Sequence, residues 1–145
     1  MMKQSAGARD TSLGTNAPFA AAALVADGVE LVVVGGCALV VAGHSDRCSD
    51  LDVVPRPDPA NLLRLFEALD ALGATSPGER AISERPVTSA TSPFGRIDLL
   101  VETARREYDA LADRSTAYRV AGVLVPIAAT VDVLRLRARF RGNDE

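Results

Sequence analysis

The sequence predicts an α+β domain built on a small mixed β-sheet, and three observations point to this fold class. Leu31–Val34 is a continuous apolar run, rich in β-branched residues and ended by two glycines, as in a buried strand. Apolar side chains recur at helical spacing between residues 62 and 72. Farther along, pairs of short apolar segments flank turn signatures at 92–95 and 121–122. Such interspersed strands and helices are typical of an α+β protein.

In the first half of the chain, the predicted elements are a helix at 17–27, a strand at 31–34, a short helix at 37–42, a strand at 51–54 and a helix at 59–72. Asn16 and Asp58 are the expected N-caps. Pro59 stands at a first helical position, where its missing N–H is harmless. Gly73 stands where a helix C-terminus is expected, and Pro55 ends the second strand.

In the second half, the predicted elements are strands at 87–91 and 96–101, a helix at 107–114 and a hairpin of strands at 118–120 and 123–127, after a connection at 76–83. From Thr130 onward two interpretations compete. Leu134–Arg141 alternates apolar residues and arginines with a period of two, like a strand. Thr130 as an N-cap and Asp132 in the first turn favour a helix, and we predict a helix.

Length and composition limit the organisation of the chain. Its 145 residues suit one domain, and a hydrophobic content of 48% excludes a disordered chain. The longest apolar stretch, Leu31–Ala42, is interrupted by two glycines and is too short to cross a bilayer, so no membrane partner is expected. Residues 1–18 are polar and small. We expect a flexible leader there rather than a signal peptide, followed by a single domain at 19–145.

Charge and cysteine content narrow the class of partner and the compartment. The net charge of −3 argues against a surface that attracts nucleic acid everywhere, although four arginines crowd residues 135–141. The two cysteines, Cys37 and Cys48, form neither a disulfide framework nor a metal-ligand spacing. They fit reduced thiols, so the sequence predicts a cytoplasmic protein.

Two carboxylates stand where the polar loop of "GHSDRCSDLDVV" becomes an apolar strand. Asp50 and Asp52 are two residues apart, so they share one face of the strand, about 7 Å apart. Ionised carboxylates there repel each other and lose hydration unless a cation lies between them. Mg²⁺ is typically held by one or two carboxylates, and substrate phosphates complete its shell. The alternative is a strand end whose aspartates simply face water.

Two neighbouring motifs favour the metal interpretation. Gly35 and Gly36 close a buried strand just before a helix, and glycine lets backbone N–H groups approach a phosphate closely. Asp98 lies on a second apolar strand, within "GRIDLL". If that strand pairs beside the strand of Asp50 and Asp52, three carboxylates converge, as two-metal chemistry requires.

The stretch "VVVGGCALVVAGHSDRCSDLDVV" resembles the signature of the nucleotidyltransferase superfamily: two small residues, a short helix, then Asp-x-Asp on the next strand. Three later stretches, "NLLRLFEALDALGA", "FGRIDLLVE" and "VAGVLVPIAATVDVLRLRARFRGND", resemble the nucleotidyltransferase-like toxins of bacterial abortive-infection and toxin–antitoxin systems. The similarity spans roughly residues 30–144. It implies the minimal nucleotidyltransferase fold, with helices packed mainly on one face of the sheet.

The resemblance also implies a role for each matching residue. Asp50, Asp52 and Asp98 would bind two Mg²⁺ ions, with Mn²⁺ as a substitute, and Asp98 would also be the base for the acceptor hydroxyl. The residues that would contact the nucleotide are Gly35, Gly36, Arg47, Ser49, Arg137 and Arg141. Arg137 stands where the toxin-like proteins have a lysine, and the spacing from Arg47 to the first aspartate is one residue tighter than usual. Arg135 and Arg139 would be left for the acceptor or solvent.

The implied activity is metal-dependent transfer of a nucleoside monophosphate from an NTP to a hydroxyl group. By resemblance, the acceptor is the 3′ end of a tRNA or a cognate toxin or antitoxin protein, and a homo-oligomer is compatible with this class. The alternative is a non-catalytic module that binds nucleotides or a protein partner and keeps only the fold.

Overall fold

A computed structural model describes residues 16–75 and 86–144, and side chains up to residue 139. The elements of the first half are α2 (Ala17–Ala26), β1 (Leu31–Val34), α3 (Gly35–Val41), β2 (Leu51–Pro55) and α4 (Pro59–Leu72). Those of the second half are β3 (Val87–Ser92), β4 (Gly95–Leu100), α6 (Val101–Arg114), β5 (Thr116–Val120), β6 (Val123–Ile127) and α7 (Thr130–Asp144). Residues 1–15 of the predicted leader lie outside the described residues, as does the whole of the predicted connection at 76–83.

The strands form one mixed sheet in the order β3-β4-β2-β1-β6-β5. The pairs β1–β2, β3–β4 and β5–β6 are antiparallel, whereas β2–β4 and β1–β6 are parallel. The predicted α+β class and small mixed sheet are therefore confirmed. The central strands β1 and β2 are almost wholly buried, which explains why they are apolar apart from Asp52 in β2.

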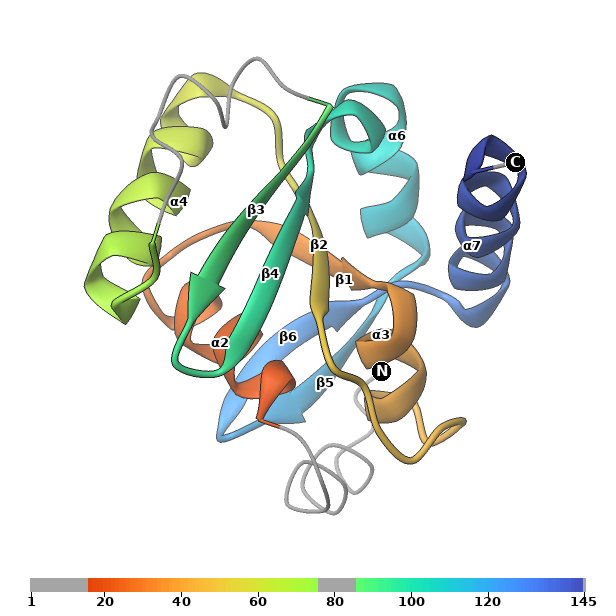
Figure 1. Cartoon of the computed structure of the whole chain (residues 1–145), viewed down its shortest axis with the longest axis horizontal. Helices are drawn as coiled ribbons and strands as arrows, with labels where there is room; N and C mark the ends of the chain where they lie inside the picture. The colour runs from red at the N-terminus through yellow and green to blue at the C-terminus, as the bar shows by residue number, and fades with distance from the viewer. Residues whose placement is uncertain (1–15, 76–85, 145) are drawn as a thin grey trace.

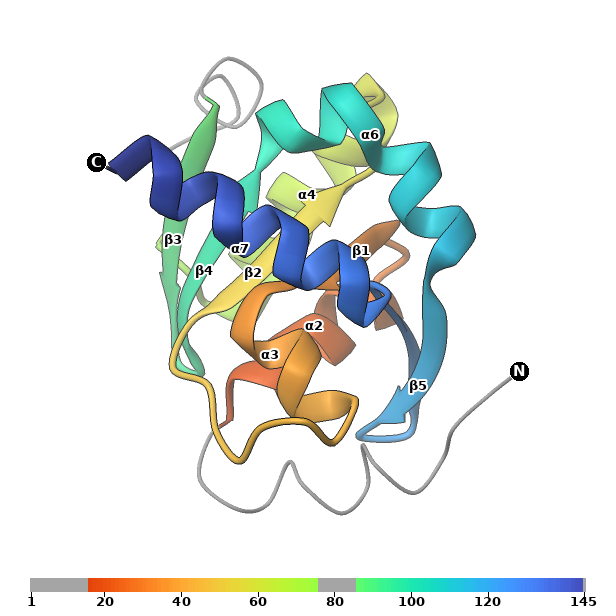
Figure 2. The same ribbon diagram turned by 90° about the vertical axis from the view of Figure 1, so that its right-hand side faces the viewer.

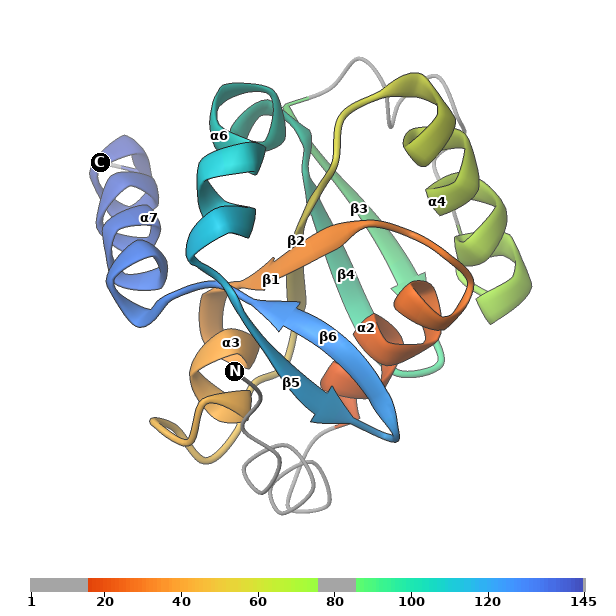
Figure 3. The same ribbon diagram turned by 180° about the vertical axis from the view of Figure 1, so that it is seen from behind.

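The helices divide between the two sides of the sheet more evenly than the resemblance implies. In Figure 2, α7 crosses in front of the sheet, on the same side as α3 and α6. Figures 1 and 3 show α2 and α4 on the opposite side. The core lies in the layers between, where its largest fully buried side chains are leucines, isoleucines and a valine of both helices and strands.

Local sequence signals explain where most elements begin and end. Asp58 caps α4, since its carboxylate accepts a hydrogen bond from the backbone N–H of Asn61, and Gly73 ends the helix in the left-handed conformation. Helix α6 begins at Val101, six residues before its predicted start. The predicted start, Glu107, is instead a kink with non-helical backbone angles inside the helix.

The cysteine prediction is wrong. Cys37 and Cys48 are joined in a disulfide, and their Cα atoms lie 5.2 Å apart. The sequence has only two cysteines, and their spacing alone does not predict a disulfide. The pairing arises because the loop after α3 doubles back along that helix before entering β2. The disulfide thus ties the third residue of α3 to the loop just ahead of Asp50.

Among the described residues, no helix combines the length and the apolar character needed to span a membrane.

Candidate active site

The three predicted aspartates come together on two adjacent strands. Strand β4 pairs parallel to β2, and Asp52 is the register partner of Asp98. The neighbouring partners are Leu51 and Ile97, so one step further along the same register sets Asp50 opposite Arg96. Alternate residues of a strand share a face, and therefore these four side chains meet on one face of the sheet. We call Asp50, Asp52, Arg96 and Asp98 the charged quartet.

Asp98 is the most enclosed member of the quartet, with a side chain only 12% exposed. The Ser89 hydroxyl donates to its Oδ1 at 2.6 Å from the adjacent strand β3. Arg96 Nε donates to Oδ1 at 3.0 Å and Arg96 Nη2 to Oδ2 at 3.2 Å. Asp52 adds a further side-chain hydrogen bond. The carboxylate of Asp98 is thus held from three directions.

Arg96 bridges the quartet. Besides its paired contact with Asp98, its Nη2 lies 3.7 Å from Asp50 Oδ2. With every group ionised, the quartet carries three negative charges and one positive charge, a net −2. A divalent cation matches that charge.

The protonation of the two central acids differs. Burial, followed by the hydrogen bond and the charge of Asp98, raises the pKa of Asp52 to about 7. Burial alone would raise the pKa of Asp98 as well, but hydrogen bonds from Ser89, Arg96 and Asp52 lower it below its ordinary value. In the absence of a cation, Asp52 is therefore the member of the pair that holds a proton near neutral pH.

Gly35 begins α3 at the edge of the quartet. Its φ is +70°, and a Cβ at this position would collide with the Asp52 carboxylate. The missing side chain therefore lets Asp52 lie against the turn, a role that the sequence did not indicate. A Cβ on Gly36 would make only an ordinary contact, 3.5 Å from Cβ of Cys48.

The loop before β2 carries the other predicted residues of this motif. Arg47 and Ser49 are both exposed there. The backbone oxygen of Ser49 lies 3.3 Å from where a Cβ of Gly95 would be, so this loop packs against the β3–β4 turn. Cys37 Sγ lies 3.2 Å from the backbone oxygen of Asp50. The disulfide thus borders the quartet directly.

Helix α7 confirms the helical interpretation and corrects the expected roles of its arginines. Arg135 Nη2 donates to Glu107 Oε1 at 2.6 Å, and Arg139 Nη1 lies 3.3 Å from Glu107 Oε2. Both arginines reach one carboxylate because they are one helical turn apart. The expectation that they are free for an acceptor or solvent is therefore wrong. Arg137 is two residues from each of them, so its Cα lies on a different side of the helix, and the residue is half-buried. The side chain of Arg141 lies outside the described part of the chain.

Sequence reasoning missed Arg96 and Ser89. The sequence did contain a signal for Arg96. This residue stands two positions before Asp98 on the same predicted strand, so the two side chains must lie on the same face of the strand. Ser89 had none, because its contact depends on the register in which β3 pairs with β4. The role of Glu107 could not be predicted from the sequence either, because its partners Arg135 and Arg139 are about thirty residues away in the chain.

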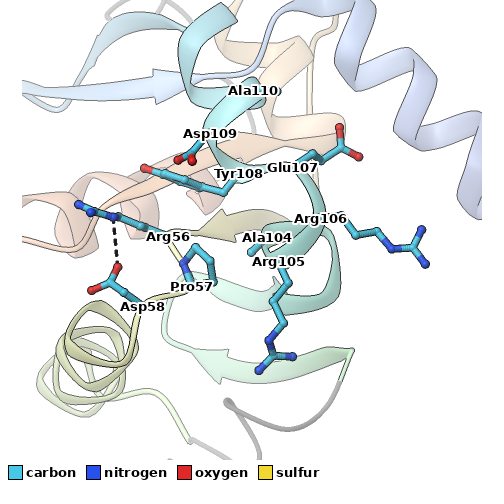
Figure 4. A pocket seen from close by; sticks show the side chains of 10 residues that line it. All are labelled: Arg56, Pro57, Asp58, Ala104, Arg105, Arg106, Glu107, Tyr108, Asp109 and Ala110. Atoms are coloured by element: carbon cyan, nitrogen blue, oxygen red, sulfur yellow. Dashed lines mark ion pairs between the residues drawn. The ribbon is translucent and has the colours of Figure 1, made fainter.

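A hollow of about 680 Å³ lies between α6 and the segment after β2 (Figure 4). It contains none of the predicted site residues. Arg56 at its wall is paired with Glu30 and Asp58, and Arg106 is paired with Glu102. The charges of these two arginines are thus compensated, and the quartet remains the better candidate for chemistry.

The quartet fits a divalent cation in its chemistry. No three acidic, histidine or cysteine side chains form a ready metal cluster within residues 16–75 and 86–139. Mg²⁺ nevertheless needs only one or two carboxylates from the protein when phosphates supply other ligands. Asp52 and Asp98, adjacent and in partial competition for one proton, are such a pair.

No protein-family model and no curated protein matches this sequence. Its fold does have a match, the crystal structure of a protein from Thermotoga maritima that is provisionally assigned as a nucleotidyltransferase. The two structures superpose with a TM-score of 0.64, at 10% sequence identity, over 88% of this chain and 83% of that chain. At this identity the likeness establishes the fold alone, which is the α+β fold of that protein.

Proposed function

We propose that this chain is a metal-dependent nucleotidyltransferase, which moves a nucleoside monophosphate from an NTP to a hydroxyl group and releases pyrophosphate. The charged quartet carries the proposal. With every group ionised, three aspartates on adjacent strands and Arg96 carry a net charge of −2 beside the Gly35 turn, and a bound cation would relieve it. The sequence resemblance and the shared fold support the same activity.

In this proposal Asp50, Asp52 and Asp98 hold Mg²⁺, as one or two ions, and Mn²⁺ can replace it. When bound, the metal neutralises triphosphate charge and favours the ionised acceptor hydroxyl. Asp98 accepts the proton of that hydroxyl. The backbone at Gly35 and Gly36 contacts the triphosphate, along with side chains from the loop before β2 and from α7: Arg47, Ser49, Arg137 and Arg141.

The acceptor is proposed from the resemblance. It is the 3′ end of a tRNA, or a hydroxyl side chain on a cognate protein, within a bacterial toxin–antitoxin or defence system. The two acceptors differ in the molecule that becomes labelled, so one experiment separates them.

That experiment incubates the protein with Mg²⁺, total tRNA or the cognate protein, and each α-labelled NTP in turn. We expect label on one acceptor, together with released pyrophosphate. Asp52→Asn and Asp98→Asn should lower the rate by about 10²–10⁴-fold, as expected for the loss of a group that handles metal or proton. Far-ultraviolet circular dichroism should show both variants folded. Absence of label with every NTP and both acceptors, or equal label with Asp52→Asn, would refute the proposal.

A non-catalytic nucleotide-binding or interaction module is the second candidate. The observation that favours it is that the Asp98 carboxylate already accepts hydrogen bonds from Ser89, Arg96 and Asp52 within the protein. Asp98 therefore has partners without a metal or a substrate. Such a module would bind an NTP with Mg²⁺ and release no pyrophosphate. Calorimetry beside the transfer assay distinguishes the two candidates.

A further inference from the structure

We propose that Arg96 stands in for the divalent cation while the site is metal-free, and that its guanidinium turns to the nucleotide phosphates when the cation binds. This inference rests on the proposed function and adds to it a residue that the sequence motifs did not include. It is carried by the hydrogen bonds around Asp98 and by the exposure of Arg96.

The Asp98 carboxylate has no free acceptor position for a cation. A carboxylate offers about four lone-pair sites. Asp98 receives one hydrogen bond from Ser89, two from Arg96 and one from Asp52. A cation can bind Asp98 only if one of these donors leaves.

Arg96 is the donor most able to leave. Ser89 is a short neutral side chain fixed on β3 at the register position opposite Asp98. Loss of the hydrogen bond from Asp52 would free only one position, and the paired contacts of Arg96 would still cover both oxygens of Asp98. Arg96 instead has a long side chain that is 56% exposed, so it can move without disturbing the core.

Charge repulsion enforces the exchange. Arg96 contacts both Asp50 and Asp98, and these are the oxygens that a cation would use. Two positive charges at contact distance repel, and a divalent ion doubles the repulsion that a monovalent ion would exert on Arg96. Arg96 therefore cannot stay between the aspartates once the cation is present.

The displaced guanidinium has a matching partner in the incoming nucleotide. The three aspartates and a divalent cation sum to −1, so a bound triphosphate leaves the site strongly negative. A planar guanidinium pairs well with phosphate oxygens through two parallel hydrogen bonds. Arg96 thus helps to select a ligand that brings the cation and the phosphates together.

The test measures binding with two probes: Mn²⁺ alone, by electron paramagnetic resonance, and a non-hydrolysable NTP analogue with Mg²⁺, by calorimetry. Arg96→Ala should bind Mn²⁺ about tenfold more tightly than wild type, and the analogue about tenfold more weakly. Arg96→Lys keeps the positive charge but loses the planar guanidinium with its paired donors. This variant should bind Mn²⁺ like wild type and bind the analogue more weakly. Arg106→Ala is the matched control, an exposed arginine with one carboxylate partner on α6, and should change neither affinity.

The outcomes separate this inference from the proposed function. If wild type binds Mn²⁺ and Arg96→Ala binds it equally or more weakly, the competition is refuted while the proposed function stands. If Arg96→Ala binds the analogue as wild type does, the phosphate contact is refuted. If wild type and all variants bind neither probe, the proposed function fails and this inference fails with it.

Discussion

Asp52 and Asp98 face each other across the parallel β2–β4 pair, and their carboxyl groups share a hydrogen bond. Two acids at one register position can bond in this way only while one of them keeps its proton. Asp52 keeps it, since Asp98 has Ser89 and Arg96 to stabilise its charge. The metal-free protein therefore stores a proton where the proposed reaction needs a cation.

This arrangement predicts how stability varies with pH when EDTA removes divalent cations. Burial and the neighbouring Asp98 raise the pKa of Asp52 from its ordinary value of 3.8 to about 7 in the folded protein. A carboxyl group with a raised folded pKa favours folding in its protonated form, so its contribution is lost as pH rises through 7. Thermal melts should show stability falling between about pH 4 and about pH 7, by a few kcal/mol at about 1.4 kcal/mol per pKa unit.

Asp52→Asn should abolish most of that slope and melt at a higher temperature than wild type at pH 8, because the amide cannot ionise. Asp70→Asn, at an exposed position of α4, is the control and should keep the wild-type slope. A slope that Asp52→Asn leaves unchanged would contradict the shared proton.

Gly35→Ala should destabilise the protein more than Gly122→Ala. Both glycines have positive φ, +70° and +82°, so each substitution strains the backbone by about 1–2 kcal/mol. Nothing lies within 4 Å of a Cβ at Gly122, whereas a Cβ at Gly35 meets the Asp52 carboxylate. The difference between the two variants in urea unfolding therefore measures the cost of the contact with Asp52. Mn²⁺ binding should weaken only in Gly35→Ala. Equal losses would show that Asp52 moves aside freely.

Arg135→Ala should lower the free energy of unfolding by about 1.5–3 kcal/mol, the scale of hydrogen bonds to a charged group. The variant loses the contacts of Arg135 with Glu107 and with the buried Asp132. A hydrogen bond and the charge of Arg135, joined by Arg139, lower the pKa of Glu107 despite its burial. A lowered folded pKa contributes stability that is lost as pH falls, so the difference from wild type should shrink in acid.

Urea unfolding at neutral and acid pH measures this effect. Arg119→Ala is a suitable control, because Arg119 is exposed and donates only to the backbone oxygen of Gly122 among the contacts described for it. Its stability should stay within about 0.5 kcal/mol of wild type. An equally small change in Arg135→Ala would mean that α7 does not depend on Glu107.

Arg137→Ala should weaken NTP binding by about 1.5–3 kcal/mol, the scale of a charge-assisted hydrogen bond, and leave stability nearly unchanged. The reason is its position on α7, on a different side from the Glu107-bound row of Arg135 and Arg139. Calorimetry with an NTP analogue and Mg²⁺ measures the loss. Wild-type affinity in Arg137→Ala would remove α7 from the nucleotide site.

Reduction should destabilise the protein by about 3 kcal/mol, because the Cys37–Cys48 disulfide closes a loop with a sequence separation of 11. Dithiothreitol should lower the melting temperature of wild type and leave Cys48→Ser unaffected, since that variant has no disulfide to lose. Non-reducing peptide mapping should recover the two cysteines in one linked fragment. A melting temperature that dithiothreitol does not change would contradict the crosslink.

Signals within a few residues of each other could be interpreted from the sequence. The caps of α4, the buried strand β1, the second hairpin and the pair Asp50 and Asp52 on one strand face all followed from local spacing. The early part of α6 was not predicted, because it begins directly at the end of β4 without a capping side chain. The kink at Glu107 then looked like a helix start.

The sequence by itself determined the α+β class, most of the elements and the identity of the three aspartates as a candidate site. Only the tertiary structure decided that Asp52 meets Asp98, that Arg96 bridges the quartet, that Ser89 completes it and that Cys37 reaches Cys48. The physical reason is that helix and strand periodicity are properties of neighbouring residues. Strand register and charge pairing instead join residues far apart in the chain, and the packing of the whole sheet sets them.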